Sequence, residues 1–171
     1  MELSEEYLEA IEKASQIVAS SSYVVAMVGA GMSAESGIPT YRGAGGLWTR
    51  IGEPDPRAFQ NFATDPKGWW ERTLERDTQP ESPDRAGFRD AMRNATPNPG
   101  HYALAELERM GVLKHIITQN VDNLHCAAGS KLVAEIHGNR TLLRCVECHY
   151  RVPRDEFEIH EHDLPPKCPQ C

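Results

Sequence analysis

The sequence has no long apolar run. No stretch of its 171 residues approaches the ~20 apolar residues that a membrane-spanning helix needs. The opening residues, MELSEEYLEAIEK, are acidic and lack the pattern of a secretory signal peptide. Basic charge is also scarce: 18 Lys and Arg stand against 25 Asp and Glu, and the net charge is −7. This balance argues against a nucleic-acid backbone as the main partner. We therefore expect a cytoplasmic protein with no membrane segment and no direct nucleic-acid contact.

Cysteine is sparse and unevenly placed. Of five cysteines, Cys126 stands alone, and the others form two C-x2-C pairs, Cys145 with Cys148 and Cys168 with Cys171. In a reducing compartment, this spacing favours metal ligands over the alternatives, disulfides or free thiols. Four thiolates fill a tetrahedral site and leave no open position, so the pattern predicts one structural Zn²⁺.

Apolar periodicity predicts an α/β fold. Strands are expected at 23–28, 112–118 and 132–136, an amphipathic helix at 4–20, a short helix from Ser33 to before Pro39, and a helix at 101–110. Residues 47–99 are punctuated by proline, so only short helices fit there. Strands that alternate with helices imply a parallel sheet, and three strands make up one half of a doubly wound nucleotide-binding domain.

Three segments with polar or glycine residues follow the predicted strands. The first, Gly29-Ala30-Gly31-Met32-Ser33-Ala34, is a G-x-G-x-x-A pattern, whose glycines let the backbone approach a pyrophosphate. On its own, this pattern also fits a tight strand–helix turn. The second, residues 118–125, places Gln119, Asn120 and Asp122 at the carboxyl end of the sheet; a polar loop that caps the next helix explains it equally well.

The third segment, Ile136-His137-Gly138, follows the last predicted strand. A histidine titrates near neutral pH and can act as a general base. A lone histidine is more often structural. Because His137 would share one crevice with the other two strand ends, it is the favoured base.

Taken together, these motifs resemble the sirtuin family of NAD-dependent protein deacylases. The matching stretches are GAGMSAESGIPTYRG (29–43), TQNVDNLH (118–125), IHG (136–138) and the two C-x2-C pairs, in the family's order. The resemblance implies a Rossmann-like NAD-binding part at 1–46 and 100–143, a cofactor loop and small helical segment at 47–99, and a zinc-ribbon module at 144–171. It also implies NAD and one structural zinc as cofactors, and an acylated lysine of a protein as substrate. The products would be nicotinamide, O-acyl-ADP-ribose and free lysine.

The resemblance also implies residue roles. The predicted NAD contacts are Gly29, Ala30, Gly31, Ser33, Ala34, Ile38, Tyr41, Arg42, Gln119, Asn120, Val121 and Asp122. Among them, Asn120 and Asp122 would hold the nicotinamide amide together with Ile38. Those two residues and His137, the base, form the predicted catalytic set.

The chain departs from the family's pattern in two places. Tyr41 stands where a phenylalanine is usual, and the sequence stops at Cys171, where the family continues with an FGE-type substrate segment. We therefore expect a chain truncated after the zinc motif, with little activity alone. No tyrosine between 43 and 101 is available to pair with Arg76, so an acetyl or other uncharged acyl group is expected. The alternative functions are a non-enzymatic zinc- or NAD-binding interaction module, and an NAD glycohydrolase or ADP-ribosyltransferase.

Overall fold

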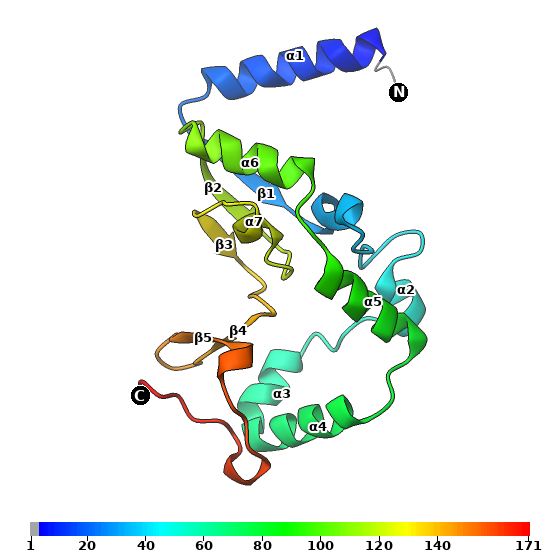
Figure 1. Cartoon of the computed structure of the whole chain (residues 1–171), viewed down its shortest axis with the longest axis vertical. Coiled ribbons are helices and arrows are strands. Elements are labelled where there is room, and N and C mark those ends of the chain that lie inside the picture. Colours follow the sequence, from blue (N-terminus) through cyan, green and yellow to red (C-terminus); the bar gives the residue numbers. More distant parts are fainter. Residues whose placement is uncertain (1–3) are drawn as a thin grey trace. The chain divides into compact units, whose positions relative to one another are not determined.

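The computed structural model describes residues 4–171 of the chain (Figure 1). Its helices and strands, in chain order, are α1 (Glu5–Ser20), β1 (Val24–Val28), η1 (Ala30–Ser36), α2 (Leu47–Ile51), α3 (Ala58–Thr64), α4 (Pro66–Thr78), α5 (Pro83–Asn94), α6 (Pro99–Arg109), β2 (Leu113–Thr118), α7 (Leu124–Ala127), β3 (Val133–Glu135), β4 (Leu142–Arg144), β5 (Arg151–Pro153), η2 (Arg154–Glu156) and η3 (Glu161–Asp163). Within the described range, no helix combines the length and apolar character needed to cross a bilayer.

The described chain divides into two compact units. The first contains the residues up to Ser33 together with Thr96–Gly138, and the second contains Ala34–Ala95 together with Asn139–Cys171. The division into 1–46 with 100–143, 47–99 and 144–171 stays a prediction.

The first unit contains a three-stranded parallel sheet in the order β1-β2-β3. The predicted α/β, Rossmann-like class is confirmed, and each strand lies within one residue of its predicted bounds. Parallel neighbours require a crossover connection, and the one from β1 to β2 ends in α6, which lies along the sheet (Figure 1). Leu113 and Ile116 of β2 are buried because this strand lies between the other two.

Helix α6 begins two residues earlier than predicted. Pro99 occupies its first turn, and Asn98 caps it by accepting hydrogen bonds from the backbone N–H groups of Gly100 and His101. Proline suits the first turn because its missing N–H would have no partner there. The reciprocal half of the capping box is the bond from the Asn98 N–H to Nδ1 of His101.

The short helix after the glycine loop differs from the prediction. It is a 3-10 helix, η1, and begins at Ala30 rather than near Ser33. Its turns close between residues three apart, from the N–H of Met32 to the carbonyl of Gly29 and from the N–H of Gly37 to the carbonyl of Ala34. The loop therefore winds tightly as soon as it leaves β1.

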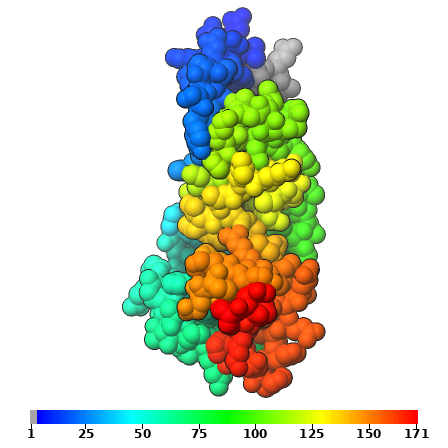
Figure 2. Space-filling view, turned by 90° about the vertical axis from the view of Figure 1, so that its left-hand side faces the viewer, coloured from blue at the N-terminus to red at the C-terminus, as the bar shows by residue number. Residues whose placement is uncertain are grey.

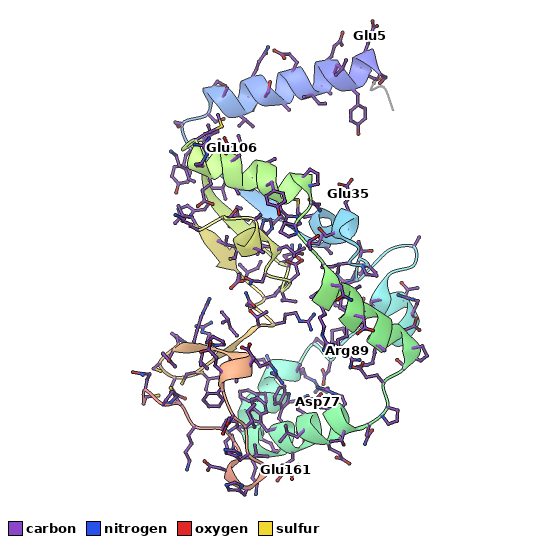
Figure 3. The ribbon with its side chains drawn as sticks, viewed as in Figure 1. Glu5, Glu35, Asp77, Arg89, Glu106 and Glu161 are labelled. Carbon is purple, nitrogen blue, oxygen red and sulfur yellow. The ribbon has the colours of Figure 1, made fainter. Side chains whose placement is uncertain are left out.

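Helix α1 forms where predicted, with Ser4 as its N-cap. Its apolar side is not covered, however: none of its side chains is buried, and Leu8 and Ile11 are about half exposed. Figure 3 shows its side chains, the labelled Glu5 among them, extending outward from the helix.

The second unit holds the short helices predicted between the prolines. Its buried side chains include Ile38, Leu47 and Met92, and α2 packs against α5 while α3 packs against α4. The antiparallel pair β4–β5 carries the cysteine-rich segment. In Figures 1 and 2 this segment, in orange and red, lies beside α3 and α4, in turquoise.

Candidate functional site

The three strands of the first unit end at the same level. Val28 pairs with Thr118, and Thr118 pairs with Glu135. The glycine loop, the 119–123 segment and the turn that holds His137 therefore leave the sheet side by side at its carboxyl edge. Open parallel sheets bind ligands at this edge.

The glycine loop is joined to the 119–123 segment by buried and part-buried hydrogen bonds. The Ser33 hydroxyl, only 1% exposed, donates to Oδ2 of Asp122 over 2.7 Å. Nδ2 of Asn120 donates to the same hydroxyl and to the carbonyl of Gly29, each over 3.1 Å. Asp122 also accepts the N–H of Leu124, the first residue of α7, although the N-cap position of that helix is Asn123, which makes no side-chain cap bond. The Asp122 carboxylate therefore contacts both the glycine loop and the start of α7.

The glycines of this loop leave open space beside the backbone. A Cβ atom built on Gly29 or Gly31 would meet no other atom within 4 Å. The space that a side chain would otherwise fill lies at the strand end, where a pyrophosphate can approach the backbone. Together with the polar side chains, this arrangement fits a dinucleotide phosphate.

Two histidines lie under the site and were not predicted to take part in it. His101 of α6 and His125 of α7 are 0% and 2% exposed, and their ring centroids are 4.9 Å apart. Burial lowers the pKa of both rings, and the nearby Asp122 carboxylate opposes the shift. Nε2 of His101 and both ring nitrogens of His125 have no hydrogen-bond partner among the described residues. Both rings are therefore held neutral at pH 7.

The remaining predicted residues of this unit line its edge. Gln119 is exposed, and its N–H donates to the carbonyl of Val28. Val121 is half-buried, and His137 is exposed in the turn directly after β3. A small hollow at this edge is lined by Asn120 and Asp122 together with His125.

Four predicted contacts, Ala34, Ile38, Tyr41 and Arg42, belong to the second unit. Ile38 is buried, and the ring of Tyr41 packs against Trp48 and Phe88. The Arg42 guanidinium lies 4.7 Å over the Trp48 ring and forms a 3.2 Å ion pair with Glu53.

The four predicted metal ligands lie together in the second unit. The Sγ atoms of Cys145, Cys148, Cys168 and Cys171 are all within 4.8 Å of one another, and none forms a disulfide. The Cys145–Cys171 and Cys148–Cys168 pairs are 3.8 and 3.6 Å apart. A tetrahedral Zn²⁺ with Zn–S bonds of ~2.3 Å places its sulfurs ~3.8 Å apart. These two pairs match that spacing, and the whole cluster, at up to 4.8 Å, would need to contract by no more than about 1 Å to enclose a zinc ion.

The protonation of these thiols also fits a cation. The backbone N–H of Cys148, followed by that of Glu147, lowers the pKa of Cys145 to about 6, whereas the neighbouring thiols raise the pKa of Cys171 to about 12. The four groups cannot all be ionised at neutral pH unless a metal ion balances their charge. Four thiolates leave no open coordination position, so the ion would be structural.

A hollow in the second unit does not resemble a catalytic site. Its volume is about 510 Å³, and it lies between α3–α4 and the cysteine loops. Half of its lining residues are aromatic or proline, and it contains none of the polar strand-end residues. The strand-end cluster of the first unit is therefore the better candidate for the nucleotide.

A family comparison agrees with this arrangement. The model of the Sir2 family matches residues 29–171, the range from the glycine loop to the last cysteine. The chain belongs to the Sir2 family.

Relatives in this family are longer than the chain. A protein named NAD-dependent protein deacetylase from Caldivirga maquilingensis is 45% identical over 168 residues, which is 97% of this chain and 60% of the relative. A solved Sir2 homologue–NAD complex is 43% identical, with a TM-score of 0.60, and the match covers 94% of this chain and 57% of that one. A solved complex of Sir2 with a p53 peptide and NAD⁺ is 30% identical, with a TM-score of 0.58 and coverage of 85% and 53%. The chain thus spans about 60% of the length of the curated relatives it matches.

The sequence contained a signal for one of the residues that were missed. The stretch Asn98-Pro99-Gly100-His101 combines a preferred N-cap residue with proline at the first helical position, which marks a helix start. Nothing in the sequence indicated that this Sir2-family chain would bring the capped end of α6 against the glycine loop. His125 was part of the motif 118–125, but its burial depends on packing against α6.

Proposed function

We propose that this chain is the NAD-binding part of an NAD-dependent protein-lysine deacylase and contributes its general base. One observation carries the proposal: Ser33 joins the glycine loop to Asp122 and Asn120 at the level ends of two parallel strands. The loop proposed to bind phosphate and the carboxylate proposed to bind the nicotinamide amide are therefore joined by a hydrogen bond. The NAD-dependent names of the relatives and the solved NAD complex support this interpretation.

We assign the NAD contacts as follows. Gly29, Ala30 and Gly31 approach the phosphates, and Ser33 and Ala34 the adjoining ribose. Asn120 and Asp122 hold the carboxamide of nicotinamide, with Val121 and Gln119 beside them. Ile38, Tyr41 and Arg42 would complete the contacts from the cofactor loop, and Arg42 would have to exchange Glu53 for a cofactor anion.

His137 is proposed as the general base. Its position in an exposed turn after β3 leaves the imidazole able to exchange protons with a bound ribose hydroxyl. When bound, NAD supplies an ADP-ribosyl group that takes the acyl group as nicotinamide leaves. The residues of the cofactor loop would exclude water from the reacting carbon, and so suppress plain hydrolysis.

The substrate is proposed to be a protein lysine that carries an uncharged acyl group such as acetyl. The solved Sir2 complex with a p53 peptide and NAD⁺ supports a peptide substrate. In α4, Thr73 is buried, and Arg76 has no tyrosine available between residues 43 and 101. An arginine without a hydroxyl partner is a weaker clamp for an acidic acyl group.

We propose a cytoplasmic location and no direct contact with nucleic acid. Four clustered thiols remain available to a metal only in a reducing compartment. The net charge of −7 disfavours phosphate backbones as partners.

The test is nicotinamide release by the purified, zinc-loaded chain of 171 residues. It is incubated with NAD, with and without an acetyl-lysine peptide, and the Caldivirga relative serves as the positive control. Release that depends on the peptide supports the deacylase proposal, and a succinyl-lysine peptide should react more slowly. Because the relatives are longer, a slow rate relative to the control is expected.

Two other outcomes would select the alternatives. Nicotinamide release without a peptide would identify a glycohydrolase or an ADP-ribosyltransferase. NAD or zinc binding without any release would favour a non-enzymatic interaction module. An Asp122→Asn variant serves as the binding-site control, since it should weaken NAD binding in every case.

A further inference from the structure

Asn98 lies at a junction between two parts of the first unit. Its side chain is 7% exposed, and it comes 66 residues after Met32 in the sequence. Nδ2 of Asn98 donates to the carbonyl of Met32, inside the glycine loop, over 2.8 Å. Oδ1 of the same side chain accepts the N–H groups of Gly100 and His101 over 3.0 and 3.2 Å. One amide group thus caps α6 and ties the loop to that cap.

Close packing accompanies this hydrogen bond. A Cβ atom built on Gly100 would lie 3.1 Å from Cε of Met32 and 3.2 Å from Oδ1 of Asn98. A larger residue at position 100 would therefore press on both groups. Both the carbonyl and the side chain of Met32 therefore contact the start of α6, the first through the hydrogen bond from Asn98 and the second through packing against Gly100.

The loop is held from two directions. Asn120 and Asp122 contact its Gly29 and Ser33 positions from the strand-end segment, whereas Asn98 contacts Met32 from α6. Ser33 is the next residue after Met32, so the position of the Met32 carbonyl constrains the direction in which Ser33 points. Without the Asn98 bond, the Met32 carbonyl would lose its side-chain partner, and only the strand-end segment would hold the loop by side-chain hydrogen bonds.

We infer that Asn98 is a positioning residue for the glycine loop. It acts by donating a hydrogen bond to the Met32 carbonyl, and this positioning role is distinct from its role as a helix cap. The loop's orientation toward a ligand then depends on α6, whose first turn also holds His101. The functional half of this inference rests on the proposed NAD site, whereas the structural half stands without it.

The Asn98→Asp variant separates the two roles. Aspartate keeps the acceptor that caps α6, and its charge suits a helix N-terminus, but it cannot donate to the Met32 carbonyl. Asn98→Ala loses both roles and is the second variant. Ser4→Ala removes the cap of α1, which has no bond to the loop, and serves as the matched control for loss of a cap.

Hydrogen exchange followed by mass spectrometry measures the protection of the glycine loop and of α6 separately, and so distinguishes the positioning role of Asn98 from its capping role. In Asn98→Asp, peptides that cover 29–37 should exchange about two- to twelve-fold faster, the range expected from one lost hydrogen bond. Peptides that cover the rest of α6, 102–109, should exchange at the parent rate. Asn98→Ala should speed exchange in both regions, and Ser4→Ala in neither. Equal loop exchange in the parent and Asn98→Asp chains would overturn the inference.

NAD binding, measured by calorimetry, provides the functional readout. If the loop binds NAD, Asn98→Asp should raise the dissociation constant by a similar factor while the melting temperature changes little. Faster loop exchange with no NAD binding by the parent chain would support the positioning role and overturn the proposed function. Unchanged NAD affinity despite faster loop exchange would overturn the functional half of the inference.

Discussion

Ser33 is the residue on which the strand-end network depends, since its hydroxyl both donates and accepts there. Ser33→Ala leaves Oδ2 of Asp122 and one N–H of Asn120 without this partner in a buried place. We expect the free energy of unfolding to fall by about 1–3 kcal/mol, measured by urea denaturation at pH 7. Ser15→Ala, which removes an exposed serine hydroxyl in α1, should change it by less than about 0.5 kcal/mol. Equal effects of the two variants would contradict the importance of the network.

His137 supports a second prediction at this scale. In a Sir2-family chain that is active in the nicotinamide-release assay, His137→Ala should lower the peptide-dependent rate by about 10²–10⁴-fold, the typical contribution of a general base. The side chain is exposed, so the melting temperature should hardly change. His115→Ala, another exposed histidine, should retain the parent rate. A His137→Ala variant with near-parent turnover would exclude this histidine as the base.

At the residue scale, the sequence was sufficient to predict those site residues that directly follow a strand. Asn120 and Asp122 follow β2 directly, so the direction of the strand places them, and the cysteine pairs are placed by their own short spacing. Asn98 and His101 were missed because their contacts join positions far apart in the sequence. No local pattern encodes a bond from Asn98 to Met32.

At the element scale, most helices and strands were predictable because their signals are local. Apolar runs mark β1 and β2, and serine with acidic residues marks the start of α1. The 3-10 form of η1 was not predictable from helix signals. Its start is fixed by the bonds of Ser33 and Met32 to other segments, which hold the chain in a tighter coil than an α-helix.

The contact between α6 and α7 makes stability depend on pH. In the folded chain, burial lowers the pKa of His101 and His125, whereas in the unfolded chain both titrate near their usual value of about 6.5. The unfolded chain therefore binds more protons below that pH. The free energy of unfolding should be highest above pH ~6.5 and fall as the pH drops below it, by at most about 1.4 kcal/mol per pH unit for each histidine.

Urea denaturation between pH 5 and 8, about the range in which histidine titrates, measures the slope of the free energy of unfolding against pH. His125→Leu should remove roughly half of it, because His101 keeps its bond to the N–H of Asn98 and remains titratable. Ser15→Ala, which removes no titratable group, should leave the slope unchanged. A parent chain whose stability is flat across this range would contradict the buried neutral pair.

The hairpin β4–β5 supports a prediction about metal. Elemental analysis of unchelated protein should find one zinc per chain, bound with an apparent free energy of about 10–16 kcal/mol. Chelation should remove the ordered amide signals of residues 144–171, the segment that the metal would hold together. Cys148→Ser should lose the zinc, whereas Cys126→Ser should keep it, because Cys126 lies outside the cluster. Zinc well below one per chain in the parent protein would refute the site.

At the scale of the whole molecule, strand β1 forms one edge of the described sheet and exposes apolar side chains to solvent. Met27 is 75% exposed and Val25 is 41% exposed. Strands of parallel sheets are usually buried on both faces, and an open apolar edge favours association. Met27→Lys should therefore reduce self-association of the chain in sedimentation experiments. Met110→Lys, at an exposed position after α6, should not. Similar sedimentation of the parent and Met27→Lys chains would show that this edge does not self-associate.

The level ends of β1, β2 and β3 also determine where the chain tolerates changes in length. One residue inserted into β2 would move Asn120 and Asp122 by ~3.3 Å and turn the following side chains to the other face of the sheet. The loops on either side of the α3–α4 pair, residues 52–57 and 79–82, carry no such constraint, since a longer loop adds little closure entropy. Natural relatives of different length should therefore differ by insertions and deletions in these two loops, and retain the spacing from Thr118 to Asp122 unchanged.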